Sequence, residues 1–237
     1  MRLVSHLKLM YSLIYRDKYM KKLVLSVAIA GTLLSTISPV FAYEQGDWVV
    51  RVGMTNVAPD DSSTNVNVGG ADLGVGVNVD SNTQLGLNFV YFYSPQLAIE
   101  VLAATPFSHD IVLNTVGPLG STKQLPPTVS ANYYFLEPSA KFQPYVGAGI
   151  NYTLFFDEKF TDANTSAGFS KLDLDNSFGL AAQLGFDYML DDKWLVNASV
   201  RWMDIDTEAS FELNGSAGSV DVSIDPVVYS ITAGYRF

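Results

Sequence analysis

The fold of this chain is decided by the stretch YVGAGINYTL, residues 145–154, in which two kinds of side chain alternate. The even positions are apolar, and the odd positions are small or polar apart from the tyrosine that opens the stretch. A period of two is typical of a β-strand whose two faces meet different surroundings. The length also matches the roughly 9–11 residues with which a tilted strand crosses a bilayer. The stretch therefore predicts a strand, either of a soluble sandwich or of a membrane barrel.

The same alternation recurs elsewhere in the chain. In residues 177–188, Phe178, Leu180 and Leu184 share one face, whereas Gln183 and Asp187 share the other. The remaining alternating stretches are residues 48–55, 84–91, 96–104, 128–135, 194–202 and 229–237. We therefore predict an all-β protein with eight strands.

The connections between these stretches are alternately long and short. Residues 57–82, 106–123, 156–172 and 209–224 form four long connections, and the three short ones carry turn residues such as Ser94-Pro95 and Asp191-Asp192. An even number of strands with both termini at one end is the layout of bacterial outer-membrane barrels. The pattern predicts an eight-stranded antiparallel transmembrane β-barrel with four long extracellular loops and three short periplasmic turns.

Composition favours the barrel over the sandwich. Charged residues make up 16 % of the chain and aromatic residues 13 %, whereas soluble proteins have about 25 % charged residues. Tryptophan and tyrosine gather near the ends of the apolar strand faces, as in the aromatic girdles at the two lipid–water interfaces. In a sandwich the same aromatic residues are more often found in the middle of the core. The girdle residues include Trp48, Tyr91, Tyr133, Tyr152, Tyr188, Trp194, Trp202, Tyr229 and Tyr235.

The N-terminus reads as a targeting segment. Met20-Lys21-Lys22 begins a basic region, an apolar run follows over residues 23–34, and Val40-Phe41-Ala42 places small residues where a signal peptidase cuts. A membrane anchor is the rival interpretation, but the run is short and ends in a processing site. We predict translation from Met20, cleavage after Ala42, and a single barrel domain over residues 43–237.

The balance of charge excludes some partners. Residues 1–42 hold six of the Lys and Arg and one of the Asp and Glu, so residues 43–237 keep 8 basic and 23 acidic side chains, a formal net charge of −15. Nucleic acid is therefore not an expected partner, because binding phosphates requires Lys and Arg. The chain has no cysteine, which excludes thiolate metal sites and a lipid-modified cysteine anchor. We expect no cofactor and no bound metal.

Several longer motifs run in order from residue 82 to the last residue. They are NTQLGL (82–87), IEVLAATPF (99–107), LPPT (125–128), PYVGAGINYT (144–153), WLVN (194–197), MDIDT (203–207) and AGYRF (233–237). Together they resemble the outer membrane protein W (OmpW) family, whereas residues 59–80 match no part of that pattern. The resemblance implies a barrel in the cell outer membrane of a Gram-negative bacterium, in contact with lipid and lipopolysaccharide. It also implies passage of small hydrophobic molecules and, in some members, a role as colicin receptor.

The lumen of so narrow a barrel has room for side chains or for one small ligand. The alternation directs Arg51, Glu100, Asp187 and Arg236 into it. Because an unpaired buried charge is costly, we expect these side chains to pair in a network toward the periplasmic side. The network either closes the lumen or only holds the barrel together.

A small hydrophobic pocket is expected near the outer ends of the strands. Leu102 faces inward, and Pro106 and Phe107 follow where the third strand leaves the membrane, so these three residues are predicted to line it. The alternative is that Leu102 only fills space. Arg201 occupies a position where the family pattern has an aromatic residue, so a pocket lined by Arg201 is more polar or differently gated.

One acidic group resembles a metal site. Asp204, Asp206 and Glu208 share one face near a strand end, and oxygen ligands in a cluster can hold Ca²⁺. The spacing of a calcium-binding loop is absent, however, which favours a solvated rim.

The sequence does not favour an enzyme. Ser108, His109 and Asp110 are adjacent, and the side chains of neighbours do not converge as a catalytic triad must. His109 is the only histidine after residue 42, and we expect it to be a solvent-exposed loop residue.

Three functions remain open at this point. The first is a narrow channel or binding pocket for small hydrophobic molecules. The second is a structural or adhesive barrel whose loops meet phage, colicin or host. The third, which the lack of a suitable base disfavours, is a lipid-modifying enzyme.

Overall fold

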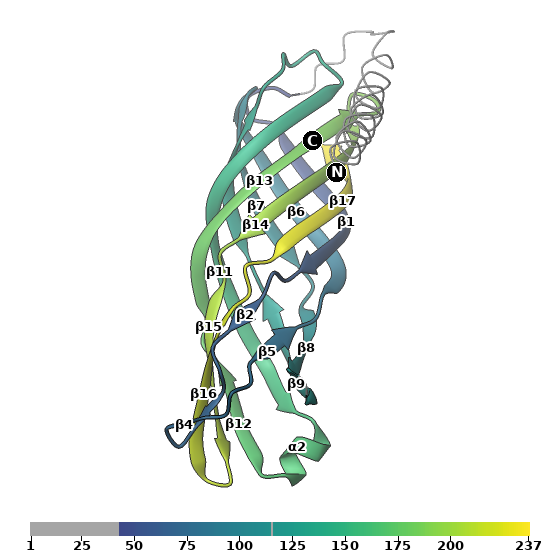
Figure 1. The fold of residues 1–237 in the computed structure, drawn as a ribbon. Helices are drawn as coiled ribbons and strands as arrows, with labels where there is room; N and C mark the ends of the chain where they lie inside the picture. The colour runs from purple at the N-terminus through teal and green to yellow at the C-terminus, as the bar shows by residue number, and fades with distance from the viewer. Residues whose placement is uncertain (1–42, 115) are drawn as a thin grey trace, which may run out of the picture. The chain divides into compact units, whose positions relative to one another are not determined.

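The computed structural model describes residues 43–114 and 116–237 (Figure 1). The predicted signal peptide and the segment before it, residues 1–42, lie outside the described residues. Within the described ranges, no helix has both the length and the apolar character needed to span a bilayer.

The eight predicted strands close into an antiparallel barrel (Figure 1). Strand β1 pairs with β17, and β10 pairs with β11, so that the sheet described here has no open edge at barrel level. Closure matters because lipid offers no hydrogen bonds to an unpaired strand edge. The prediction of an eight-stranded antiparallel barrel is therefore confirmed. The strands are β1 (Trp48–Ala58), β6 (Asn82–Ser94), β7 (Leu97–Ala104), β10 (Thr128–Tyr134), β11 (Phe142–Phe160), β13 (Ser177–Met189), β14 (Trp194–Met203) and β17 (Val227–Arg236).

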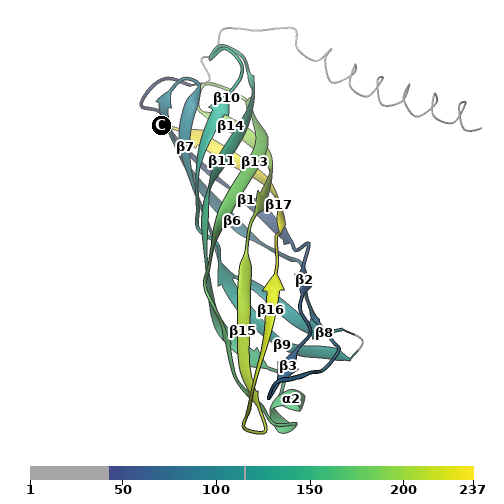
Figure 2. The same cartoon turned by 60° about the vertical axis from the view of Figure 1, so that its left-hand side comes forward.

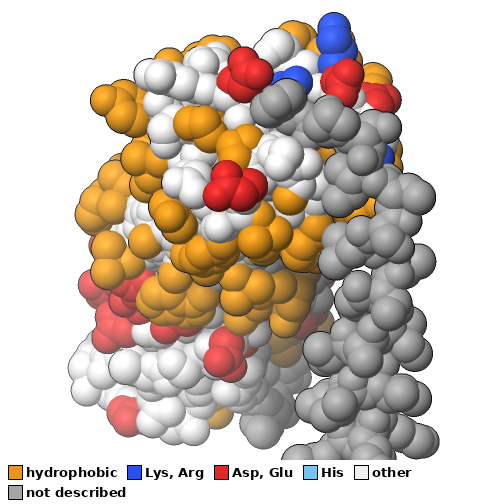
Figure 3. All heavy atoms as spheres, turned by 90° about the horizontal axis from the view of Figure 1, so that it is seen from above, with side chains coloured by type: hydrophobic (Ala, Val, Ile, Leu, Met, Phe, Trp, Pro, Cys, Tyr) orange, Lys and Arg blue, Asp and Glu red, His pale blue; other side chains and the backbone are white. Residues whose placement is uncertain are grey.

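The two faces of each barrel strand differ as the alternation predicts. On β13, Phe178 and Leu184 are 67 % and 61 % exposed, whereas Gln183 and Asp187 are buried in the lumen. Hydrophobic side chains accordingly gather in a broad patch on the outer surface, where Figure 3 shows them in orange. In the middle of the barrel, apolar residues thus face outward and polar residues inward, which is the reverse of a soluble protein.

The long connections do not remain irregular loops, because most of their residues form strands beyond the barrel, and we call this part of the molecule, made by the four long connections, the extension (Figure 2). Their own alternation explains this: Phe211, Val220 and Val222 are buried, while their neighbours in sequence are less so. One part is a hairpin of β8 (Phe107–Leu113) and β9 (Gly117–Leu125), with β5 (Val77–Val79) on β8 and β11 on β9. The other part is a sheet of β12 (Phe169–Leu174), β15 (Asp206–Leu213), β16 (Ser216–Ser223), β3 (Asn67–Val68) and β4 (Ala71–Asp72), with β2 (Ser62–Ser63) on β16; the short helix α2 (Asp162–Ser166) follows β11.

The pairing of neighbouring strands is interrupted between the β7–β10 pair and the β8–β9 pair. Pairing of β7 with β10 ends at Leu102 and Thr128, and pairing of β8 with β9 begins at Phe107 and Gln124. Between these pairs, residues 103–106 face residues 125–127 without a ladder pair among the described residues. Three of these residues are prolines, which lack the backbone N–H that a ladder needs. We call this interruption the seam.

The interior has three levels, which the order of residues along β14 makes plain. Leu195 belongs to a buried base cluster, Asn197 and Arg201 to a polar layer, and Met203 to an outer core. The base cluster is Tyr43, Val49, Val90, Phe92, Ala98, Tyr134, Tyr145, Met189 and Leu195. The polar layer is Arg51, Asn88, Glu100, Asn132, Gln183, Asp187, Asn197 and Arg201. The outer core includes Val57, Val66, Val77, Phe107, Ile111, Leu119, Phe155, Met203, Ile205, Phe211, Val220, Val222 and Ile224.

Candidate functional site

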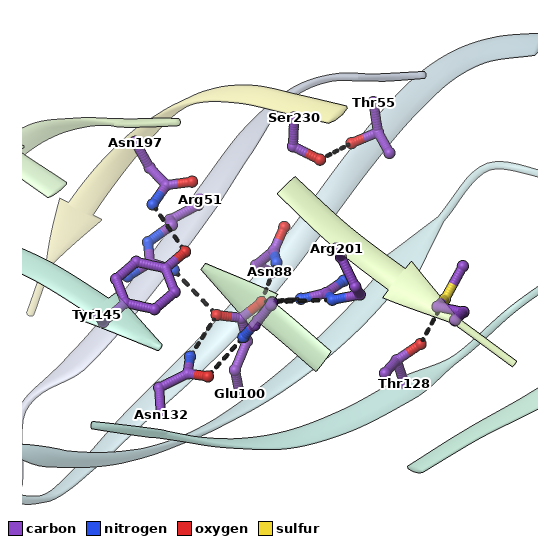
Figure 4. Close-up of polar contacts among 12 residues, drawn as sticks. Arg51, Thr55, Asn88, Glu100, Thr128, Asn132, Tyr145, Asn197, Arg201 and Ser230 are labelled. Carbon is purple, nitrogen blue, oxygen red and sulfur yellow. Dashed lines mark hydrogen bonds and ion pairs between the residues drawn. The ribbon is translucent and has the colours of Figure 1, made fainter. Parts of the chain in front are cut away.

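Two arginines and two carboxylates form the centre of the polar layer, and Figure 4 shows three of the four, Arg51, Glu100 and Arg201. Arg51 Nη1 lies 3.1 Å from Glu100 Oε2, and Arg51 Nη2 lies 2.6 Å from Asp187 Oδ2. On the other side of Glu100, Arg201 Nη2 lies 2.5 Å from Oε1. The four side chains come from β1, β7, β13 and β14. Their contacts therefore tie together strands from around the barrel.

Amide side chains complete the coordination of the two carboxylates. Asn88 Nδ2 donates to Glu100 Oε1 over 2.6 Å, and Asn132 Nδ2 donates to Oε2 over 2.8 Å. Asn197 Nδ2 donates to Asp187 Oδ1 over 2.8 Å. Both carboxylates are thus paired and fully hydrogen-bonded, the condition under which buried charge is tolerated. The two positive and two negative charges also cancel.

The structure places two of the predicted residues differently. Arg201 donates to Gln183 and Glu100, so it belongs to the polar layer. Arg236 lies at the rim of the base, where its Nη1 is 3.4 Å from Asp47 Oδ2. The reason is register: Arg51 sits opposite Gly234, and Arg236 is therefore one inward position nearer the barrel end.

Tyr43 fills the base of the lumen, although no strand pattern marks it. Its ring stacks on Phe92 with 3.8 Å between centroids, and its edge meets Tyr134 at 5.3 Å. Tyr134 Oη in turn accepts a hydrogen bond of 2.7 Å from Arg51 Nη2. Tyr43 precedes the first alternating stretch, so periodicity could not have found it. Together the base cluster and the polar layer fill the lumen with side chains.

An apolar cavity of about 40 Å³ lies in the outer core, away from the polar layer. Its lining comes from both parts of the extension and includes Ile111, Phe155, Phe160, Phe211, Val220 and Val222. The sequence predicted a pocket lined by other residues. Leu102 and Phe107 are buried but do not line this cavity, and Pro106 is exposed at the seam. The difference arises because the connections fold inward as strands and supply their own apolar faces.

His109 does line the cavity, and the expectation that it is exposed is wrong. Its side chain is 2 % exposed because β8 turns that face into the outer core. Nδ1 lies 2.6 Å from the carbonyl oxygen of Asp80, and Nε2 lies 2.9 Å from Gln124 Nε2. Burial lowers the pKa of His109 below its ordinary 6.5, and the hydrogen bond to Asp80 with the nearby carboxylates of Asp110 and Asp80 opposes this only in part.

The acidic group of the sequence is only partly assembled. Asp206 and Glu208 line an open groove on the extension together with Asp175 and Asp221. Asp204 is not part of that lining.

Comparison with known proteins agrees with this architecture. The model of the OmpW family matches residues 44–237. Outer membrane protein W of Vibrio cholerae serotype O1 is 48 % identical over 223 residues, which cover 92 % of this chain and 100 % of that protein. The crystal structure of the outer membrane protein OprG from Pseudomonas aeruginosa superposes with a TM-score of 0.81 at 44 % identity, over 84 % of this chain and 99 % of that one.

A more distant relative is also similar over most of its length. The dibenzothiophene metabolism operon protein PahQ of Pseudomonas aeruginosa is 28 % identical over 216 residues, which cover 90 % of this chain and 98 % of that protein. The resemblance seen in the motifs from residue 82 onward is thus confirmed across the whole barrel. This protein is a transmembrane β-barrel of the Gram-negative outer membrane, and the chain belongs to the OmpW family.

Proposed function

We propose that this barrel accepts small hydrophobic molecules from outside the cell, holds them in the outer core and releases them sideways into the membrane. One observation carries the proposal, which is the position of the apolar cavity. Side chains fill the lumen on one side of it. On another side, the cavity-lining residue Gln124 directly precedes the unpaired residues of the seam. The cavity lining is apolar, so burial of an apolar solute there is favourable.

The cost of each exit route favours the seam. Passage through the base would require a solute to part Arg51 from Glu100 and Asp187, and breaking a buried ion pair costs about 3–5 kcal/mol. Parting the seam breaks no ladder hydrogen bond, because none joins residues 103–106 to 125–127.

The cavity volume indicates a closed state. Ligand pockets usually enclose about 300–1,000 Å³, whereas this cavity measures about 40 Å³. A solute must therefore push outer-core side chains apart as it enters. The lining comes from two different sheets, and no strand pair joins β5, β8 and β9 to β12, β15 and β16 among the described residues, so we expect the two parts to separate with few backbone hydrogen bonds broken.

The relative PahQ gives independent support for the class of solute. Its name associates it with metabolism of dibenzothiophene, a flat aromatic molecule with little polarity.

An engineered disulfide across the seam, which a reductant can break again, tests the proposal. Ala104 and Pro126 lie two positions beyond the last pair of β7 and β10, and both side chains face inward. Because the chain has no cysteine, the double variant Ala104→Cys and Pro126→Cys can form only one disulfide within the chain, and mass spectrometry of the oxidised protein checks that it forms. We expect cells with this oxidised variant to take up naphthalene no faster than cells without the protein, and a membrane-permeant reductant to restore uptake.

The matched control places the disulfide where the wall is already paired. Ala148→Cys with Ala182→Cys joins opposed residues of β11 and β13, and uptake should stay at the wild-type rate. Full uptake through the locked seam would refute sideways release. Absence of uptake by the wild-type protein would favour the second candidate, a barrel whose extension serves as a receptor or adhesive surface.

We also propose that the barrel has no lipid-hydrolase activity. The alternation of β8 exposes Ser108 and buries His109, so the two side chains point to opposite faces of the strand. Hydrolysis of phospholipid by the purified barrel that disappears in Ser108→Ala would contradict this proposal.

A further inference from the structure

One polar atom at the outer-core cavity has no partner. Gln124, on β9, is 1 % exposed and lines the cavity. Its Oε1 accepts no hydrogen bond from the described residues, 43–114 and 116–237. A buried acceptor left without a donor destabilises the state that contains it. The surface of the closed cavity is apolar, so Oε1 lies behind it, and a solute that parts the lining side chains and brings a donor satisfies this atom.

The amide cannot correct this by turning over. The carbonyl oxygen of Asp80 can only accept, so His109 Nδ1 carries the proton in the 2.6 Å contact between them. His109 Nε2 is then an acceptor in the neutral ring, and the Gln124 amide must present its Nε2–H to it. Rotation of the amide would set Oε1 against a second acceptor. The contact with His109 thus fixes the orientation of the Gln124 amide, and Oε1 is the atom that has no hydrogen-bond partner.

The other polar side chains at the cavity are already satisfied. Thr122 Oγ1 donates to the carbonyl oxygen of Lys123 over 3.3 Å, and Thr207 Oγ1 donates to that of Asp175 over 2.7 Å. Both nitrogens of His109 have partners. Gln124 Oε1 is therefore the one unsatisfied side-chain atom among the described residues of the cavity lining.

We infer that the outer core selects apolar molecules that carry a single hydrogen-bond donor, such as phenols and small alcohols, and that Gln124 Oε1 accepts that hydrogen bond. The inference rests on the proposed function, because it names a solute class for the same cavity. A purely apolar solute fills the space but leaves Oε1 unpaired. A charged solute would lose its hydration in an apolar environment without an opposite charge.

Phenol and toluene are the probes, because they have nearly the same shape and differ in the donor. Binding is measured by equilibrium dialysis against nanodiscs that contain the full barrel, with empty nanodiscs subtracted. Each dissociation constant is corrected for the partition of the solute between water and hexadecane. We expect corrected binding of phenol to be stronger than that of toluene by about tenfold, the size of effect that satisfying one buried acceptor produces.

Two variants identify the atom responsible. Gln124→Met keeps the length of the side chain and removes the acceptor, so the preference for phenol should disappear. Thr122→Val removes a hydroxyl that is already bonded on the same strand and at the same cavity, so the preference should remain. Circular dichroism checks that each barrel is folded, and the comparison of solutes on the wild-type protein stands without either variant.

The outcomes separate the two proposals. If both solutes bind and the corrected preference is absent or persists in Gln124→Met, selection by Gln124 is wrong while the hydrophobic site stands. If neither solute binds to the folded wild-type barrel, the proposed function fails and the selection fails with it.

Discussion

The hydroxyl of Tyr43 donates a hydrogen bond of 2.5 Å to Oδ2 of Asp187, which lies 144 positions further along the chain. Tyr43 is also the residue that directly follows the predicted cleavage site after Ala42. Tyr43 is therefore the first residue of the predicted mature chain, and its side chain fills the base of the lumen. Its burial links the base cluster to the charges above it.

Replacing Tyr43 tests how much its side chain contributes to the free energy of unfolding of the barrel. Tyr43→Ala leaves a cavity under Arg51, and loss of a buried aromatic ring costs about 3–5 kcal/mol. Tyr43→Phe keeps the stack on Phe92 and removes only the hydroxyl, so we expect a loss of about 1 kcal/mol. Urea unfolding in lipid vesicles measures both. Equal stability of the alanine variant and the wild type would show that the ring does not support the barrel.

Neutralising Glu100 should destabilise the barrel strongly. Glu100→Gln keeps the shape of the side chain but leaves Arg51 and Arg201 without their shared carboxylate, which costs about 3–5 kcal/mol when the pair is buried. The control is Glu208→Gln in the exposed part of the extension, where we expect a change within about 0.5 kcal/mol. The same urea series compares them, and a Glu100 effect no larger than the control would rule out a stabilising polar layer.

Acidification should weaken the extension through His109. Its pKa is lowered by burial, so below pH 6.5 the unfolded chain takes up a proton before the native chain does. The stability that neutral His109 contributes is therefore complete above about pH 6.5 and is lost as the pH falls toward the lower native pKa. NMR titration of the His109 ring measures that value. A value at or above 6.5 would contradict the burial seen here, and His109→Gln should remove this part of the pH dependence of unfolding.

The three tryptophans should report on lipid rather than on the cavity. Trp48, Trp194 and Trp202 are 51 %, 50 % and 41 % exposed, and all lie on outward strand faces. We expect brominated lipids to quench their fluorescence and solute binding in the outer core to leave it nearly unchanged. Quenching by an aqueous quencher in place of brominated lipid would place these faces outside the bilayer.

Much of the barrel could be predicted because its signal is local. Alternation places Val146 and Ile150 on one face and Gly147 and Asn151 on the other whatever their partners are. The extension is harder to predict, because β2, β3, β4 and β5 have only two or three residues each and its longer hairpins are interrupted by turns such as Asn214-Gly215. The sequence therefore predicts loops where the structure has strands.

The candidate site could be predicted only in part. Arg51, Glu100 and Asp187 meet at the lumen, and a charged residue at an inward position is visible in the sequence. The burial of His109 was not visible, because it depends on β8 packing beside β9 and β5.

By itself the sequence determined the number of barrel strands, their inward and outward faces, the low charge that suits lipid and the family to which the chain belongs. Only the tertiary structure decided that Tyr43 reaches Asp187, that Arg201 joins the polar layer, and that Gln124 is left with an unpaired oxygen. The physical reason is the distance along the sequence between the residues that interact. A strand's two faces follow from neighbours two positions apart, whereas hydrogen bonds across a closed lumen depend on register and curvature that all eight strands set together.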